Sequence, residues 1–407
     1  MHQVNLLNRK VYKAGVMLAM APLLAAANLS IVFAQVTVTD VGRVKNPYSL
    51  VYQPGRHRIV GDTVAGAPQA TTPDRDLWQI DLNNIPPDVS SQTAPSSNVF
   101  DFGDLARTRT GWRRVAPTGV QRNLPNGFIQ DEIFALRREG TGTATTYHIR
   151  RYSPDGTSSS NFVNLPTTNL ATNADNLALH VDHTGAWNYD LLIAFQPDDS
   201  IQSVHLYRAD GFGNLTFVGA EPVRTGAPPL SQVRGMTVLP NDPAKYGSYA
   251  GHLLMLREEP SVTSGSYGAI PGSLMYTVDP VSGTFTTHSP LGLRAAVATV
   301  ITGRFVYVSD WGASTVRLFE IPDLEDYLGD ILLGVTDSGY AGAATHSPGL
   351  YRLYWDGSSW QTQMLVDFAA LGYGFKDFSV TVVPEPASLL ALSGGLAFVA
   401  LRKRRKA

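Results

Sequence analysis

The sequence contains no cysteine, and only 16% of its residues are charged. The absence of cysteine excludes disulfides, thiolate metal sites and cysteine nucleophiles. The 32 basic and 34 acidic residues leave a formal net charge of −2, so the chain offers no basic field of the kind that attracts nucleic acid. It also lacks a G-x-S-x-G elbow, a P-loop, an HExxH zinc motif and a dinucleotide fingerprint. No short motif therefore assigns it to an enzyme class.

Long apolar runs are confined to the two ends of the chain. Near the start, basic residues precede an uncharged stretch at 14–34 that ends in Ala34, a small residue of the kind that signal peptidase favours. Residues 1–34 are therefore predicted to form a secretory signal peptide, with Gln35 as the mature start. An uncleaved membrane anchor is the alternative.

At the other end, residues 387–401 are uncharged and rich in Leu and Ala, and a basic cluster at 402–406 follows them. This run is shorter than the roughly 20 apolar residues of a stable membrane span, so it predicts a short, marginal transmembrane helix. The basic cluster would hold its own end in the cytoplasm. Pro384 and Pro386 stiffen the approach and leave Glu385 in extended chain that a protease can reach.

This order of features resembles the PEP-CTERM sorting signal of exported proteins in Gram-negative bacteria. The resemblance covers residues 384–407 and implies cleavage near the Pro-Glu-Pro by an exosortase-type membrane protease. It also implies transient anchoring in the inner membrane and delivery to the cell envelope or the medium. The residues that carry it are Pro384, Glu385, Pro386, Arg402, Lys403, Arg404 and Arg405. An ordinary C-terminal anchor is the alternative.

Between the two signals, residues 35–383 repeat one pattern, and 37 Gly and 26 Pro supply turns throughout the chain. A short apolar run is followed by a turn-rich gap and a second run of aromatic and aliphatic residues that ends in Asp or Gly. The copies lie at 131–156, 190–213, 251–283, 303–322 and 329–359, with a weaker one at 58–84. Such short runs, bounded by turn residues and rich in β-branched and aromatic side chains, predict strands rather than helices.

Several copies have a further strand pattern before them, including 295–301 before the fourth, so four antiparallel strands per unit are predicted. We therefore expect an all-β domain, a β-propeller of six or seven blades, with a multi-sheet β-sandwich as the alternative. Strand patterns at 36–42 and 376–383 are expected to close the ring within one blade. Residues 234–255 also resemble inner-strand pairs of six-bladed, quinone-dependent sugar dehydrogenases, which supports the fold only.

Polar residues that could carry chemistry are few. His180, Asp182 and His183 form the densest cluster, but a metal site needs three or more converging ligands. Asp310, with Trp311, could hold a sugar ring, and Arg234 is a further candidate. The catalytic candidates are therefore His180, Asp182, His183, Arg234 and Asp310, each of which also has an ordinary role in a loop or turn. We expect no metal and no cofactor, although Asp198 and Asp199 could supply oxygens to Ca²⁺.

Two functions follow from this sequence. The first is a non-enzymatic, exported propeller that binds extracellular polysaccharide or an envelope protein, since the PEP-CTERM resemblance implies bacteria that make exopolysaccharide and biofilm. The second is a propeller enzyme acting on carbohydrate, as a hydrolase, a lyase or a quinone-dependent oxidoreductase. An enzyme should bring several of the candidate side chains together in one pocket.

Overall fold

The computed structural model describes most of the chain from Val36 to Val383. The described ranges are 36–63, 77–92, 94–102, 116–139, 146–167, 177–197, 203–222, 232–258, 273–288, 291–336, 346–374 and 378–383. The predicted signal peptide, all seven residues of the sorting motif, and Asp198 and Asp199 lie outside these ranges.

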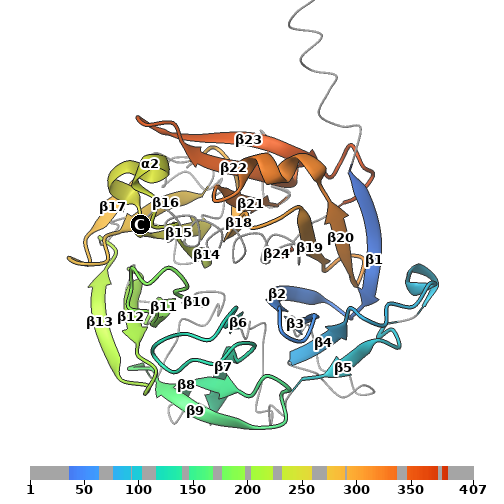
Figure 1. The fold of residues 1–407 in the computed structure, drawn as a ribbon, viewed down its shortest axis with the longest axis horizontal. Helices are drawn as coiled ribbons and strands as arrows, with labels where there is room; N and C mark the ends of the chain where they lie inside the picture. Colours follow the sequence, from blue (N-terminus) through green and yellow to red (C-terminus); the bar gives the residue numbers. More distant parts are fainter. Residues whose placement is uncertain are drawn as a thin grey trace, which may run out of the picture. The chain divides into compact units, whose positions relative to one another are not determined.

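Six four-stranded antiparallel sheets stand around a ring, as Figure 1 shows. The first three blades are continuous in sequence. Blade one contains β2 (Pro47–Gln53), β3 (Arg58–Thr63), β4 (Leu77–Asp81) and β5 (Val99–Asp101). Blade two contains β6 (Thr118–Gly119), β7 (Ile133–Glu139), β8 (Thr146–Tyr152) and β9 (Ser159–Asn164). Blade three contains β10 (Leu177–Val181), β11 (Leu191–Phe195), β12 (His205–Ala209) and β13 (Leu215–Ala220).

Blade four is also continuous, whereas the last two blades are interleaved. Blade four contains β14 (Gln232–Val238), β15 (Leu253–Glu258), β16 (Leu274–Val278) and β17 (Phe285–Thr287). Blade five contains β18 (Ala295–Val300), β21 (Ile331–Val335), β22 (Gly349–Trp355) and β23 (Trp360–Asp367). The closing blade contains β24 (Val380–Val383), β19 (Phe305–Asp310), β20 (Thr315–Glu320) and β1 (Thr37–Arg43). The short helices are η1 (Val89–Ser91), α2 (Pro243–Tyr246), η3 (Gly247–Tyr249) and η4 (Pro322–Tyr327).

The predicted propeller is confirmed, with six blades, and the β-sandwich alternative is wrong because the six sheets surround a ring. The predicted closure is confirmed too, since β1 and β24 belong to one sheet, with β19 and β20 between them. One expectation was wrong: the strand at 295–301 does not pair with the copy at 303–322 but with β21 of the next copy. The chain leaves blade five after β18, forms the β19–β20 hairpin in the closing blade, and returns.

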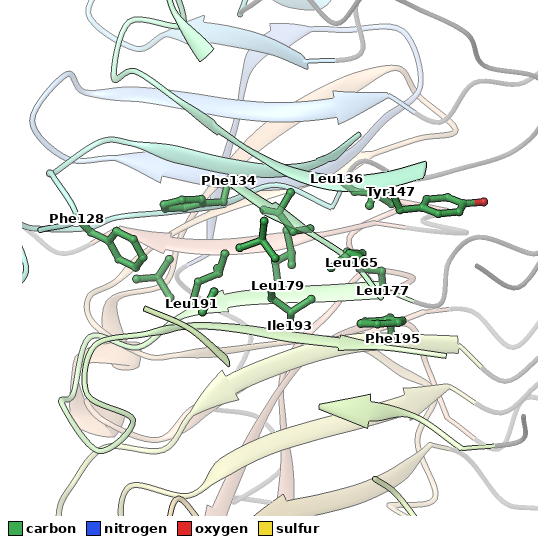
Figure 2. Packing of buried hydrophobic residues seen from close by; sticks show 14 of the residues in the cluster. Phe128, Phe134, Leu136, Tyr147, Leu165, Leu177, Leu179, Leu191, Ile193 and Phe195 are labelled. Atoms are coloured by element: carbon green, nitrogen blue, oxygen red, sulfur yellow. The ribbon is translucent and has the colours of Figure 1, made fainter. Parts of the chain in front are cut away.

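The interior of the ring consists of apolar layers between neighbouring blades. Figure 2 shows the layer between blades two and three, where Phe134 and Leu136 of β7 lie opposite Leu191 and Ile193 of β11. Further buried clusters lie between blades three and four, four and five, one and two, and between blade one and the closing blade. Phe319 of the closing blade packs on Phe368 beside blade five. Each blade is therefore held by burying both faces of its sheet, which explains the apolar runs in the second strands, such as Leu191–Phe195 and Ile331–Val335.

The recurring Asp at the end of the third strand has a structural role. In five blades its carboxylate accepts the backbone N–H of the residue two positions later, which forms the turn into the outer strand. These residues are Asp81, Asp155, Asp210, Asp279 and Asp356. Hydrogen bonds from Ser153 and Thr157 lower the pKa of Asp155 to about 2.

In each blade the strand given first above is the inner strand, which lies next to the centre of the ring, and the strand given next is the second strand. The six inner strands all end on the same side of the ring, where each pairs with the start of the second strand. We call this side the exit face, since β24 ends on it. It is defined by the last residues of the inner strands, which are Gln53, Gly119, Val181, Val238, Val300 and Val383. Among the described helices, none is long and apolar enough to cross a membrane, and residues 387–401 lie outside the described ranges.

Candidate functional site

A cavity of about 460 Å³ lies at the centre of the ring and is lined by residues from all six inner strands. Its wall is mostly aliphatic, with Leu50, Leu179, Met236 and Val380 among the lining side chains, and threonine hydroxyls lie between them. The wall is apolar because an inner strand packs against the neighbouring inner strands and leaves only part of one face to the channel. Among the described lining residues the ionisable side chains are His180, His183 and Arg122.

The two histidines lie at the exit-face end of this cavity and connect blade three to both neighbouring blades. The backbone N–H of Val238, in blade four, donates to Nε2 of His180 at 3.2 Å. The backbone N–H of Gln121, in blade two, donates to Nε2 of His183 at 2.9 Å. A ring nitrogen that accepts such a bond is unprotonated, so both imidazoles are neutral.

Burial supports the same protonation state. It lowers the pKa of His180 to about 4, against a smaller raising effect of the Asp182 carboxylate. Burial, with the neighbouring His180, lowers the pKa of His183 to about 3. The two ring centroids are 6.3 Å apart. The histidines therefore share one end of the cavity, but the acceptor nitrogen of each is already occupied by a backbone donor.

Asp182, between them in sequence, is fully buried and turns away from the cavity into its own loop. Its carboxylate accepts from the backbone N–H groups of Thr184, Gly185, Trp187 and Tyr189, at 2.8 to 3.2 Å, and from the Thr184 hydroxyl at 2.7 Å. This carboxylate therefore holds the loop at 182–189 in place.

Asp310 lies apart from this group, at the end of β19 in the closing blade. Its carboxylate forms a short ion pair with Arg317, which also contacts Asp40 at 3.0 Å. The backbone of Arg234 belongs to β14, at a bulge in its pairing with β15, but its side chain lies outside what the structure describes. The structure thus brings His180 and His183 together at the cavity and places Asp182 and Asp310 in separate hydrogen-bonded networks. Among the described residues there is also no group of three His, Asp or Glu side chains placed to hold a metal.

A second group, which sequence reasoning missed, lies between blades four and five. Tyr249 of η3 meets Trp355, at the end of β22, with ring centroids 5.1 Å apart. Trp355 in turn faces Trp360, at the start of β23, at 5.6 Å, and His288 contacts Tyr249 at 5.2 Å. We call Tyr249, His288, Trp355 and Trp360 the aromatic cluster. All four side chains are partly exposed.

A signal for this cluster exists in the sequence. Trp355 and Trp360 flank the turn Asp356-Gly357-Ser358-Ser359, and residues that face each other across an antiparallel hairpin lie on the same side of the sheet. His288 is the polar member of the cluster, and its Nε2 lies 2.8 Å from the hydroxyl of the buried Thr277. An aromatic surface with adjacent hydrogen-bonding groups is suited to a ligand that has one apolar face and several hydroxyls.

Comparison with protein families assigns the end of the chain. Residues 382–405 match the PEP-CTERM protein-sorting motif. The chain carries a PEP-CTERM sorting signal. The motif implies processing by exosortase, a membrane protease, and indicates an exported protein that is sorted to the cell envelope. The resemblance identified in the sequence is thereby confirmed.

Among solved structures, the chain is similar to the GH93 α-L-arabinofuranosidase of Fusarium graminearum at 10% identity and a TM-score of 0.42, over 81% of this chain and 86% of that one. It is also similar to the PQQ-bound aldose sugar dehydrogenase of Streptomyces coelicolor at 10% identity and a TM-score of 0.37, over 85% and 89% of the two chains. These values are too low to carry an inference about activity. No curated protein matches the chain.

Proposed function

We propose that this protein is a non-enzymatic binding component of the cell envelope of a Gram-negative bacterium, and that its partner is an extracellular polysaccharide of the biofilm matrix. The aromatic cluster is the observation that carries the proposal. Its four partly exposed rings come from two neighbouring blades, and one of them is the polar imidazole of His288. Sugar rings stack on such surfaces through their C–H faces, while their hydroxyls bond to adjacent polar groups.

The polar groups in and beside the central cavity are already engaged within the protein, which favours binding over catalysis. The imidazoles of His180 and His183 accept backbone N–H groups, and the Asp182 carboxylate is saturated by its own loop. A general base must be within hydrogen-bond reach of a substrate proton. These side chains would have to break interblade or loop hydrogen bonds to act in that way.

The proposal includes the route of the protein to its site. Residues 387–401 insert into the inner membrane until exosortase cuts near Pro384, Glu385 and Pro386, and the propeller is then delivered to the envelope. Binding requires no cofactor. Affinity measured with and without added Ca²⁺ tests that statement, and a requirement for Ca²⁺ would contradict it.

The experiment is affinity electrophoresis of purified protein through gels containing extracellular polysaccharide from the producing strain. Trp360→Ala should weaken binding by roughly fivefold, since one aromatic contact contributes about 1 kcal/mol. Trp360→Phe keeps a ring and should retain most of the affinity. Phe100→Ala is the matched control, because Phe100 is an exposed aromatic residue on blade one.

Equal retardation of the wild-type and Trp360→Ala proteins would contradict the proposal. The enzyme alternative is tested on the same samples. New reducing ends, an unsaturated sugar or an oxidised sugar after incubation with the polysaccharide would indicate a hydrolase, a lyase or an oxidoreductase.

A further inference from the structure

The two ends of the propeller leave the ring on the same face. Thr37, the first residue of β1, pairs with Glu320, which pairs with Phe305, which pairs with Val383. These four residues form one row across the closing blade at the exit face. Three strand spacings separate Thr37 from Val383, or about 14 Å.

The position of Val383 at the centre of the ring fixes how the propeller is attached. β24 is an inner strand, and its residues Val380 and Val382 line the central cavity. The uncharged stretch begins at Ala387, four residue steps after Val383, so the connection spans at most about 14 Å. If such a short connection left the rim of the propeller, the propeller could stand on edge on the membrane. Because it leaves the centre of the ring, the exit face is held toward the membrane.

Large apolar side chains are exposed in the loops of the same face. Among the described residues, five such side chains lie in loops of the exit face. They are Ile85, Ile129, Phe212, Val281 and Leu328, which we call the apolar tips. Phe100 and Phe217 are also exposed, on the outer strands β5 and β13.

Two of the apolar tips are held outward by the repeated turn. The backbone N–H groups of Phe212 and Val281 donate to the carboxylates of Asp210 and Asp279, both at 2.9 Å. The side chains at these turn positions are 89% and 94% exposed. At the same turn position blade five has Ser358. Apolar residues on loop tips that surround a membrane attachment point are suited to the boundary between headgroups and acyl chains.

We infer that, while the sorting signal is uncut, the exit face lies against the lipid headgroup layer and the apolar tips touch it. The inference rests on the membrane insertion of residues 387–401 proposed above. The contact does not depend on anionic lipid, because the charged groups at these turns are carboxylates. The exit-face end of the cavity is then covered by the membrane, and ligands reach the channel from the opposite face.

The absence of cysteine makes this orientation measurable. Single variants Phe212→Cys, Val281→Cys, Ser358→Cys and Lys45→Cys are labelled with NBD in the chain that keeps its sorting signal. Lys45 is exposed between β1 and β2, on the opposite face, and serves as the matched control. The proteins are reconstituted in phosphatidylcholine vesicles without exosortase, and dithionite reduction of each label is timed. The three exit-face labels should react at least about fivefold more slowly than the label at 45.

The outcomes separate this inference from the proposal on which it rests. Flotation of the vesicles first shows whether the tail inserts, and failure to float would overturn the anchoring and this inference together. Flotation with equal reduction rates at all four positions would overturn the orientation alone. If the labels were reduced slowly only after exosortase was added, the exit face would be a contact surface for the protease rather than for lipid. That result would also overturn the inference. The same labelled proteins in detergent should react at nearly equal rates.

Discussion

The histidines at the central cavity make the propeller sensitive to mild acid. In the folded protein their Nε2 atoms accept backbone N–H groups from blades two and four, which requires the neutral ring. In the unfolded chain each imidazole has a pKa near 6.5. Burial lowers this to about 4 for His180 and about 3 for His183. The folded pKa is depressed, so this stability is fully present above pH 6.5 and is lost as the pH falls toward 4.

The size of the effect follows from these pKa values. At pH 5 nearly all of the unfolded state and little of the folded state carries a proton on His180, and the linked loss is about 2 kcal/mol. Part of the ring surface faces the cavity, where water stabilises the charged form, so we expect about 1–2 kcal/mol. His183 should contribute a similar amount.

Urea unfolding followed by tryptophan fluorescence, at pH 8 and at pH 5, measures this loss. His180→Gln replaces the acceptor nitrogen by an amide oxygen that does not titrate. The variant should lose about 1–2 kcal/mol less than the wild type between the two pH values. Asp190, whose pKa is raised by burial to about 6, acts in the opposite direction but equally in both proteins. An identical loss in wild type and variant would refute the reasoning.

Three further substitutions test other parts of the structure by the same unfolding assay. Glu221→Gln leaves the buried guanidinium of Arg257 without its carboxylate and should cost about 3–5 kcal/mol; a cost under about 1 kcal/mol would contradict a buried ion pair. Asp182→Ala removes the acceptor for four backbone N–H groups and should cost at least about 2 kcal/mol, whereas an unchanged midpoint would show that the loop at 182–189 holds itself. Gly61→Ala places a Cβ 2.3 Å from the Trp78 ring and should cost about 1–3 kcal/mol, so a neutral result would contradict this packing.

The sequence was sufficient for most of the strands and for a repeat of six or seven blades, because both depend on local patterns. Apolar runs between turn residues predicted the second and third strands of each blade, and an Asp near the end of five copies marked the turn. The spacing of the last two copies, 303–322 and 329–359, is too short for two whole blades, and the structure explains this spacing. The inner strand of blade five, β18, precedes both hairpins in the sequence. The inner strand of the closing blade, β24, follows them.

The hairpin exchange itself could not be predicted from local patterns. The stretch at 295–301 has the same alternation of apolar and small residues whether it pairs with β19 or with β21. In the structure β18 joins the layer between blades four and five, where Ala295 and Ala298 share a buried cluster with Leu254 and Leu333. Such contacts join residues far apart in sequence, so no local pattern contains them.

For the candidate site too, the sequence predicted the position of the polar residues but not the direction of their side chains. The alternation in His180 and Asp182 marked a polar end of an inner strand, but it did not say which side chains face the channel. The structure separates them because the Asp182 carboxylate is attracted to the unpaired N–H groups of the following loop, whereas the imidazoles reach donors in the neighbouring blades. The pairing of Trp355 with Trp360 could have been predicted from the sequence, because the two residues flank a four-residue turn and so face each other across the hairpin.

The end of β24 shows how the fold and the sorting signal share a boundary. Val383 is the last residue of the ladder with β19, and the next residue in the sequence is Pro384. Proline has no N–H to donate, so it cannot extend the ladder, and it favours extended backbone in the residue before it. The same residue that begins the protease motif therefore ends the last strand of the propeller. A slip of β24 along β19 would move Val383 away from its partner Phe305, so the register of the closing blade fixes where the motif leaves the exit face.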